Sequence, residues 1–337
     1  MSLLKKCLAF CVALAVLAVL VAGAAAWRWA STPVSLATPQ LDVTIAPRSS
    51  VRSVTVQLNR AGVPVRSDLF VLMTRLLGRQ SLLKSGNYEF RQGVTPYELL
   101  QKMSLGDVDE SVATIVEGWT FRRMRAELDA NPALRHDTAG MSDAELLTAI
   151  GAPAAPLDNG EGLFFPDTYL FDKGTSDLDI YLRAYRLMQT RLAAAWAARE
   201  PGLPLATPYE ALTLASLVEK ETGKAGDRPL VAAVFANRLR AGMPLQTDPA
   251  VIYGLGDRYA GRLHRQDLHS NTPYNTYLRP GLPPTPIALP GDASLQAALN
   301  PAATTALYFV ARGDGSSVFS DTLDEHNKAV DKYIRGQ

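Results

Sequence analysis

Residues 7–27 read CLAFCVALAVLAVLVAGAAAW, and this stretch decides the architecture of the chain. None of its 21 residues is charged, and Gly23 is the one residue outside the hydrophobic set. A helix needs about 20 consecutive apolar residues to cross the bilayer core, so the stretch predicts a transmembrane anchor. About 44% of the other residues are hydrophobic, which is ordinary for a water-soluble body.

The residues that flank the anchor predict its orientation. Lys5 and Lys6 precede it, so the positive-inside rule keeps residues 1–6 in the cytoplasm. The body then lies outside the plasma (inner) membrane, in a periplasm or another extracytoplasmic space. The alternative is a cleaved signal peptide, since residues 24–26 are three alanines, although the apolar core of a signal peptide is usually shorter, about 7–15 residues.

Charge and cysteine usage exclude several function classes. Lys and Arg number 34 against 33 Asp and Glu, a balance that argues against a strongly basic nucleic-acid binder. Both cysteines, Cys7 and Cys11, fall in the anchor, so the body has no thiol for a disulfide framework, a zinc site or a nucleophile. The length predicts about two domains.

A strand, a tight turn and a capped helix recur three times after a short polar linker at residues 28–40. The strands are expected at residues 41–46, 86–91 and 111–116, and each precedes a Ser or Thr that can cap the helix after it. Residues 128–155 are expected to be helical with interruptions, and a long helix is expected at 177–199. The pattern predicts an α+β module whose role is either carbohydrate binding or structural spacing.

The residues that carry chemistry lie on a predicted helix over Ala211–Thr222. Glu219 and Glu221 are two positions apart, about 200° around a helix, so they cannot share a face. Glu221 aligns with Leu214 and Leu217 on the apolar stripe, whereas Glu219 lies on a thinner, more polar surface.

A carboxylate on an apolar stripe is costly unless it is paired or protonated. One interpretation of Glu221 is therefore an ion pair with an arginine such as Arg228 or Arg238. The other is a general acid whose pKa is raised by burial, the form that protonates a leaving oxygen near neutral pH. The helical pattern leaves both open.

Polar and aromatic residues on proline-rich loops follow. Asn, Thr, Gln and Tyr side chains suit sugar hydroxyls and acetamide groups, although the same residues are common in turns. The histidines have no HExxH spacing, and His264, His269 and Asp267 could bind a metal only through an unusual loop geometry. Walker, GxGxxG and GxSxG motifs are absent.

The chain resembles the endolytic murein transglycosylase (YceG-like) family. Several motifs carry the resemblance in one order: 161–169 (EGLFFPDTY), 215–222 (ASLVEKET), 234–249 (VFANRLRAGMPLQTDP), 274–277 (YNTY), 281–284 (GLPP), 300–301 (NP), 308–310 (YFV) and 326–328 (HNK). One departure is Thr285, where the family is expected to have Gly.

The resemblance implies a fold and an organisation for the body. The expected parts are a LysM-like α+β module at 41–105, an intermediate α+β region at 106–205 that packs on the catalytic domain, and a lysozyme-like, mainly helical catalytic domain at 206–337. The fold class is α+β, with the single transmembrane anchor at residues 7–27.

The resemblance also implies an activity. The family cleaves the bond between N-acetylmuramic acid and N-acetylglucosamine within peptidoglycan strands and leaves 1,6-anhydro ends. Its catalytic glutamate matches Glu221, and Glu219 is the fallback. We expect neither cofactor nor metal, and partners that are peptidoglycan strands and, through the family alone, peptidoglycan synthases. Cleft positions are assigned to Gln246, Thr247, Asp248, Tyr274, Asn275 and Tyr277.

Two other functions stay open from the sequence. One is a non-catalytic scaffold that binds the cell wall, although a scaffold has no need for an acid on an apolar stripe. The other is a muramidase that uses water, with Asp248 as the base. The mass of the product separates hydrolysis, which adds a water, from transglycosylation.

Overall fold

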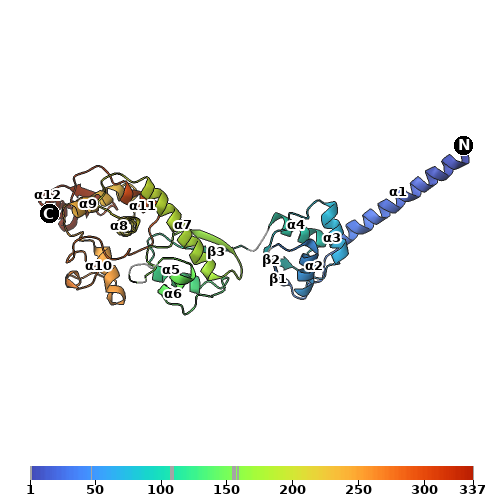
Figure 1. The fold of residues 1–337 in the computed structure, drawn as a ribbon, viewed down its shortest axis with the longest axis horizontal. Helices are drawn as coiled ribbons and strands as arrows, with labels where there is room; N and C mark the ends of the chain where they lie inside the picture. The colour runs from blue at the N-terminus through green and yellow to red at the C-terminus, as the bar shows by residue number, and fades with distance from the viewer. Residues whose placement is uncertain (1, 47, 107–109, 154–156, 158, 337) are drawn as a thin grey trace. The chain divides into compact units, whose positions relative to one another are not determined.

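The structure, a computed structural model, describes residues 2–46, 48–106, 110–153, 157 and 159–336, and Figure 1 traces their helices and strands. Contacts divide the chain into two compact units. Unit 1 is residues 1–111 with 170–173, and unit 2 is residues 112–169 with 174–337. Helices and short two-stranded sheets are mixed, which confirms the α+β class in its coarse form.

Unit 1 is a small sheet covered by helices. Strand β1 (Gln40–Ile45) pairs antiparallel with β2 (Gly86–Arg91), and Val43 faces Tyr88 in the register. The helices are α1 (Ser2–Ala30), α2 (Val51–Arg60), α3 (Ser67–Leu76) and α4 (Pro96–Leu105). The core holds fully buried side chains such as Leu58, Phe70 and Phe90. Unit 1 therefore has a hydrophobic core of its own.

Helix α1 is one long apolar helix. Within the described part of the chain it alone is long and apolar enough to cross a bilayer, over Phe10–Ala30. The predicted anchor at residues 7–27 lies within α1 and overlaps this span. A single-pass anchor therefore fits the structure.

The end of α1 packs onto unit 1. Trp29 and Val34 contact the core of the unit, and Ala30 is buried. The ring of Trp27 lies 6.2 Å from the ring of Tyr97 on α4. Residues expected to form a linker are thus partly embedded in unit 1, because their apolar side chains have a core to join.

Unit 2 contains most of the helices. Its elements, in order, are β3 (Glu110–Thr114), α5 (Phe121–Asp129), α6 (Asp143–Ala149), β4 (Thr168–Asp172), α7 (Asp177–Ala197), α8 (Pro208–Glu221), α9 (Arg228–Arg240), α10 (Asp248–Leu255), η2 (Gly256–Arg258), η3 (Asp267–His269), α11 (Asp292–Leu299), β5 (Tyr308–Ala311), β6 (Ser317–Ser320), α12 (Leu323–Val330) and η4 (Asp331–Arg335). The boundary between the units falls inside β3 and β4. The expected regions 106–205 and 206–337 lie almost entirely in this one unit.

Helix α8 is the central helix of unit 2. It contacts α7, α9, α10 and α11, which gather around it in Figure 1. All eight residues from Ala211 to Val218 are buried. The helix is therefore enclosed on every side over two turns rather than along one stripe.

Three local expectations differ from the structure. Residues 130–142 are turns and irregular backbone before the short helix α6, and Thr138 in this stretch donates hydrogen bonds to Asp177; residues 154–155 of the expected helical region lie outside the described part of the chain. The third predicted strand, β3, pairs with β4 rather than with the sheet of unit 1. Asp248 and Pro249, expected on a proline-rich loop, begin α10 instead, because Pro249 suits the first turn of a helix.

Candidate active site

The position of Glu221 follows from where α8 begins, how the helix is held by its neighbours, and where it ends. At the start, the side chain of Thr207 accepts the N–H of Glu210, and Pro208 occupies the first turn. Within the helix, the Oγ of Ser216 accepts the N–H of Ile287 at 3.0 Å, which fastens the 281–287 loop to α8. Glu221 is the last helical residue, so its carboxyl projects where the buried helix ends.

The carboxyl group of Glu221 is desolvated and has one hydrogen-bond donor. The hydroxyl of Thr247 donates to its Oε2 at 2.9 Å. Burial, with a smaller contribution from the negative charge of Asp248, raises the pKa of Glu221 to about 7. The Thr247 hydrogen bond and the positive charge of Arg238 lower the pKa and only partly offset the burial. Glu221 can therefore hold a proton near neutral pH and release it.

Thr247 is held firmly enough to orient this carboxyl. It is 1% exposed, and its N–H donates to the Oγ1 of Thr276 at 3.0 Å. The next residue, Asp248, starts α10, and its Oδ1 accepts the hydroxyl of Tyr277 at 2.6 Å. Three of the predicted cleft residues therefore meet at Glu221.

The second glutamate of α8 has a different environment. Glu219 is 7% exposed, lies 3.8 Å from the guanidinium of Arg228, and accepts the N–H of Gly291 at 3.1 Å. The contacts of Glu219 are polar groups, Arg228 and the Gly291 N–H, but its side chain is buried by them rather than exposed to solvent. Its oxygens already have structural partners.

Neither arginine considered for Glu221 pairs with it among the described residues. Arg228 lies against Glu219. Arg238 is buried and donates to the carbonyls of Leu307 at 2.7 Å and Leu245 at 3.0 Å. Because these hydrogen bonds hold Arg238, it affects Glu221 only as a nearby charge.

The remaining predicted cleft residues lie in three different settings. Gln246 is exposed with a left-handed backbone (φ 51°), and its Oε1 accepts from Arg238 at 3.2 Å. Asn275 is fully buried, and its amide donates to the carbonyls of Leu268 and Ser270. The structure thus places Asn275 inside its own loop, away from any open surface.

Tyr274 points toward a different part of unit 2. Its hydroxyl lies 2.9 Å from the Oγ1 of Thr285. Thr285, which stands where the family is expected to have Gly, is fully buried, and its backbone is not left-handed. The extra hydroxyl therefore serves as a partner for Tyr274 and fits the loop without strain.

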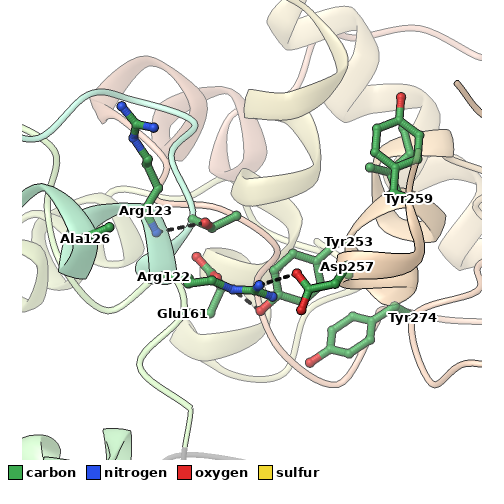
Figure 2. A pocket seen from close by; sticks show the side chains of 11 residues that line it. Arg122, Arg123, Ala126, Glu161, Tyr253, Asp257, Tyr259 and Tyr274 are labelled. Carbon is green, nitrogen blue, oxygen red and sulfur yellow. Dashed lines mark hydrogen bonds and ion pairs between the residues drawn. The ribbon is translucent and has the colours of Figure 1, made fainter. Parts of the chain in front are cut away.

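Tyr274 lines a cavity of about 650 Å³, here called the Glu161 cavity. Its wall comes from α5, the 159–162 segment, α10 and η2 (Figure 2). The lining residues are Thr120, Arg122, Arg123, Ala126, Glu161, Ile252, Tyr253, Gly256, Asp257, Tyr259 and Tyr274.

Glu161 is the buried acid of this cavity. It is 2% exposed, with one oxygen accepting the N–H of Phe121 at 2.9 Å and the other the hydroxyl of Tyr253 at 3.0 Å. Burial raises its pKa to about 7, and these hydrogen bonds lower the pKa less than burial raises it. The neighbouring glycines fit closely: a Cβ on Gly160 would lie 2.6 Å from the Phe121 ring, and one on Gly162 2.5 Å from Pro286.

The sequence interpretation did not assign Glu161 to a site. It lies in the 161–169 motif, in the dipeptide Glu161-Gly162, and a charged residue beside aromatic residues was the available signal. Its partner Tyr253 is 92 residues away, so only the tertiary structure brings the two together.

Candidate metal ligands gather away from both acids. Ligand atoms of Asp129, His136 and Asp177 lie within 4.8 Å of one another. Asp177 already accepts the N–H and the hydroxyl of Thr138. In the 264–269 loop, Asp267 accepts the N–H of His264, which is an ordinary turn contact.

Comparisons with known proteins give one consistent result. The model of the YceG-like family matches residues 43–332. The endolytic murein transglycosylase of Bacillus subtilis (strain 168) is 31% identical over 308 residues, which cover 87% of this chain and 85% of the relative. The enzyme of that name from Streptococcus pneumoniae serotype 2 (strain D39) is 27% identical over 320 residues, 86% of this chain and 57% of the relative.

A solved structure is similar as well. The crystal structure of a yceG-like protein from Listeria monocytogenes superposes with a TM-score of 0.55 at 30% identity. The match covers 86% of this chain and 98% of that one.

Proposed function

The chain belongs to the YceG-like family, and we propose that it is a membrane-anchored endolytic murein transglycosylase whose general acid is Glu221. The names of its relatives in Bacillus and Streptococcus support lytic transglycosylase activity on peptidoglycan. One observation carries the assignment of Glu221: its desolvated carboxyl has a pKa of about 7 and one hydrogen bond, from Thr247.

The first chemical step uses the protonated acid. Glu221 donates its proton to the oxygen that links N-acetylmuramic acid to N-acetylglucosamine. The bond from C1 to this oxygen breaks, and its electron pair stays on the leaving oxygen. Positive, oxocarbenium-like charge develops at C1.

The second step uses the same group as a base. The C6 hydroxyl oxygen of the muramic acid residue attacks C1, and its proton passes to the carboxylate of Glu221. The new C1–O6 bond closes the 1,6-anhydro ring and restores the protonated acid. No water is consumed, so one carboxyl group is enough.

The neighbours of Glu221 have supporting roles in this proposal. Thr247 holds the carboxyl in one orientation through its hydroxyl. Asp248 and Tyr277 form a hydrogen-bonded pair that is partly exposed and able to contact sugar hydroxyls. Gln246 is exposed, precedes Thr247 in the chain, and has the role of contacting the sugar beside Asp248 and Tyr277.

We propose the finer architecture on the same basis. Unit 1, with its separate core, is a LysM-like module, and the α8-centred helices are a lysozyme-like catalytic core. Helix α1 anchors the chain in the plasma membrane with residues 1–6 in the cytoplasm and the body outside, since Lys5 and Lys6 precede the apolar span. Peptidoglycan synthases are the partners that the family resemblance suggests.

Mass spectrometry of the products tests the function. The full chain in detergent is incubated with peptidoglycan sacculi as wild type, as Glu221→Gln, and as the matched control Glu219→Gln. We expect anhydro-ended muropeptides from the wild type and the control, and a loss of about 10²–10⁴-fold in rate with Glu221→Gln.

The other functions have distinct outcomes. Products heavier by one water would identify a muramidase, and the absence of new glycan ends would identify a scaffold. Full activity of Glu221→Gln, with loss in Glu219→Gln at unchanged circular dichroism, would transfer the acid role to Glu219.

A further inference from the structure

We infer that the Glu161 cavity is a second sugar-binding subsite, which holds another residue of the glycan strand whose bond is cleaved at Glu221. The inference rests on the proposed function and extends it to a region that the cleavage chemistry does not use. Three features support it: the chemistry of the cavity wall, its charge balance, and its connection to Glu221 through α10.

The wall combines aromatic faces with buried polar groups. The rings of Tyr253 and Tyr274 meet at 4.8 Å between centroids with an interplanar angle of 65°, and Tyr259 forms a further part of the wall (Figure 2). Glu161 contributes a buried carboxyl. A pyranose ring has an apolar C–H face and a rim of hydroxyl and acetamide groups, so it matches both kinds of surface.

The charges favour a neutral ligand. The guanidinium of Arg122 forms an ion pair with Asp257, and Arg123 lies 3.5 Å from Glu127 (Figure 2 shows Arg122 against Asp257). Both cations therefore have acidic partners within the protein. A neutral N-acetylglucosamine ring needs hydrogen-bond donors and acceptors rather than a net charge, whereas a stem peptide, or the lactyl carboxylate of N-acetylmuramic acid, would need free cations.

Helix α10 connects the cavity to the acid. Asp248, its first residue, follows the Thr247 that binds Glu221, and Tyr253 near its other end reaches Glu161. Tyr253 is the fifth residue after Asp248, which places it about 8 Å farther along the axis and about 140° around the helix. A strand that crosses α10, rather than one that runs along a single face of it, can therefore present one sugar to Glu221 and another to the cavity.

The cavity has room and a fixed shape. Its volume of about 650 Å³ is in the usual range for small-ligand sites. Tyr253 is fixed by Glu161 and Asn159, and Tyr274 by Thr285. Tyr259 has no side-chain hydrogen bond to any described residue, so its ring is free to stack on a ligand.

Direct binding tests the inference without cleavage. The full chain in detergent carries Glu221→Gln, and the probe is purified glycan strands freed of stem peptides by an amidase. Adding Tyr259→Ala should raise the Kd about tenfold, the effect of losing about 1.4 kcal/mol of contact. Tyr259→Phe keeps the ring and should stay within twofold, as should Tyr333→Ala, a half-buried tyrosine outside the cavity.

A second variant fills the cavity instead of removing a wall. Ala126 is exposed on α5 and lines the cavity, so Ala126→Trp should block it and raise the Kd at least as much, with little risk to folding. In the active enzyme, Tyr259→Ala should raise KM and leave kcat within twofold. Unchanged Kd in both Tyr259→Ala and Ala126→Trp would overturn the inference.

The outcomes separate this inference from the proposed function. If wild type releases anhydro ends while the cavity variants bind as tightly as their parent, the subsite alone is wrong. If wild type releases no new ends, the enzymatic function fails, yet a Tyr259-dependent Kd would still support the cavity as a glycan site.

Discussion

Replacing Thr247 with Val should move the alkaline limit of activity to higher pH. The acid must be protonated to act, so activity is present below the pKa of Glu221, which is about 7, and falls tenfold per unit above it. The Thr247 hydroxyl stabilises the charged carboxylate and thereby lowers this pKa. Without it, the carboxyl keeps its proton to a higher pH.

The size of this shift follows from one hydrogen bond. A hydrogen bond to a charged group contributes about 1.5–3 kcal/mol, and one to a neutral group about 1 kcal/mol. The difference, roughly 1 kcal/mol, corresponds to about 0.5–1 pKa unit, since one unit is about 1.4 kcal/mol. Valine has the shape of threonine, and the backbone of residue 247 keeps its hydrogen bond to Thr276.

Asp248→Asn should move the limit in the opposite direction. The charge of Asp248 raises the pKa of Glu221, so removing it should lower the limit, by a few tenths of a unit because this side chain is exposed and screened. Asparagine can still accept the hydroxyl of Tyr277. The two variants, Thr247→Val and Asp248→Asn, therefore test the direction as well as the size of the shift in the alkaline limit of activity.

The assay is the release of anhydro-ended muropeptides between pH 5 and 9, at substrate well below KM. The position of the alkaline limit is compared rather than the maximal rate, because both residues also line the cleft. If the two variants left the limit in place, or moved it in the same direction, the pKa of Glu221 would not govern the reaction as argued above.

Three further predictions concern stability and long-range charge. Because the pKa of Glu161 is raised, its contribution to the free energy of unfolding is fully present below about pH 4.5 and is lost as pH rises through about 7. Over that interval the wild type should lose about 3 kcal/mol of unfolding free energy that Glu161→Gln does not lose. Guanidinium unfolding at pH 4.5 and 8 measures this difference. Asn275→Ala removes three hydrogen bonds made by a buried side chain, so it should lower the unfolding free energy by about 2–4 kcal/mol in the same assay. The alkaline limit of activity of the folded enzyme should not change. A loss below about 1 kcal/mol would contradict the role of these hydrogen bonds in stability. Arg238→Met leaves buried carbonyls without a donor and should lower the free energy of unfolding by about 3 kcal/mol. Because the positive charge of Arg238 lowers the pKa of Glu221, the alkaline limit of activity should also rise. A fall in this limit would refute the charge effect.

Local signals in the sequence predicted much of the fold. The helix expected over Ala211–Thr222 is α8, which begins three residues earlier at Pro208 and ends one residue earlier at Glu221. The sequence could not show that β3 pairs with β4, since a short alternating strand carries no record of its partner. It also missed α3 (SDLFVLMTRL) and α10 (DPAVIYGL), because a short and largely apolar run does not distinguish a helix from a buried strand.

The candidate site shows a similar division. Helical spacing distinguished Glu221 from Glu219, although the physical basis differs from the expectation. Helix α8 is buried all round, and the two acids differ in their partners: Glu219 has Arg228 and the Gly291 N–H, while Glu221 has the Thr247 hydroxyl. Partners that lie 9 to 72 residues away, on another helix or on loops, cannot be derived from a helix pattern.

The packing of the end of α1 on unit 1 sets the distance between unit 1 and the membrane. Ala30 is buried in the unit and the Trp27 ring lies against Tyr97, so the apolar span continues into the folded module without slack. If α1 crosses the bilayer as proposed, unit 1 is held at a fixed height above the membrane surface, because no flexible linker separates it from the transmembrane helix. Any glycan that unit 1 binds then belongs to the layer nearest the membrane.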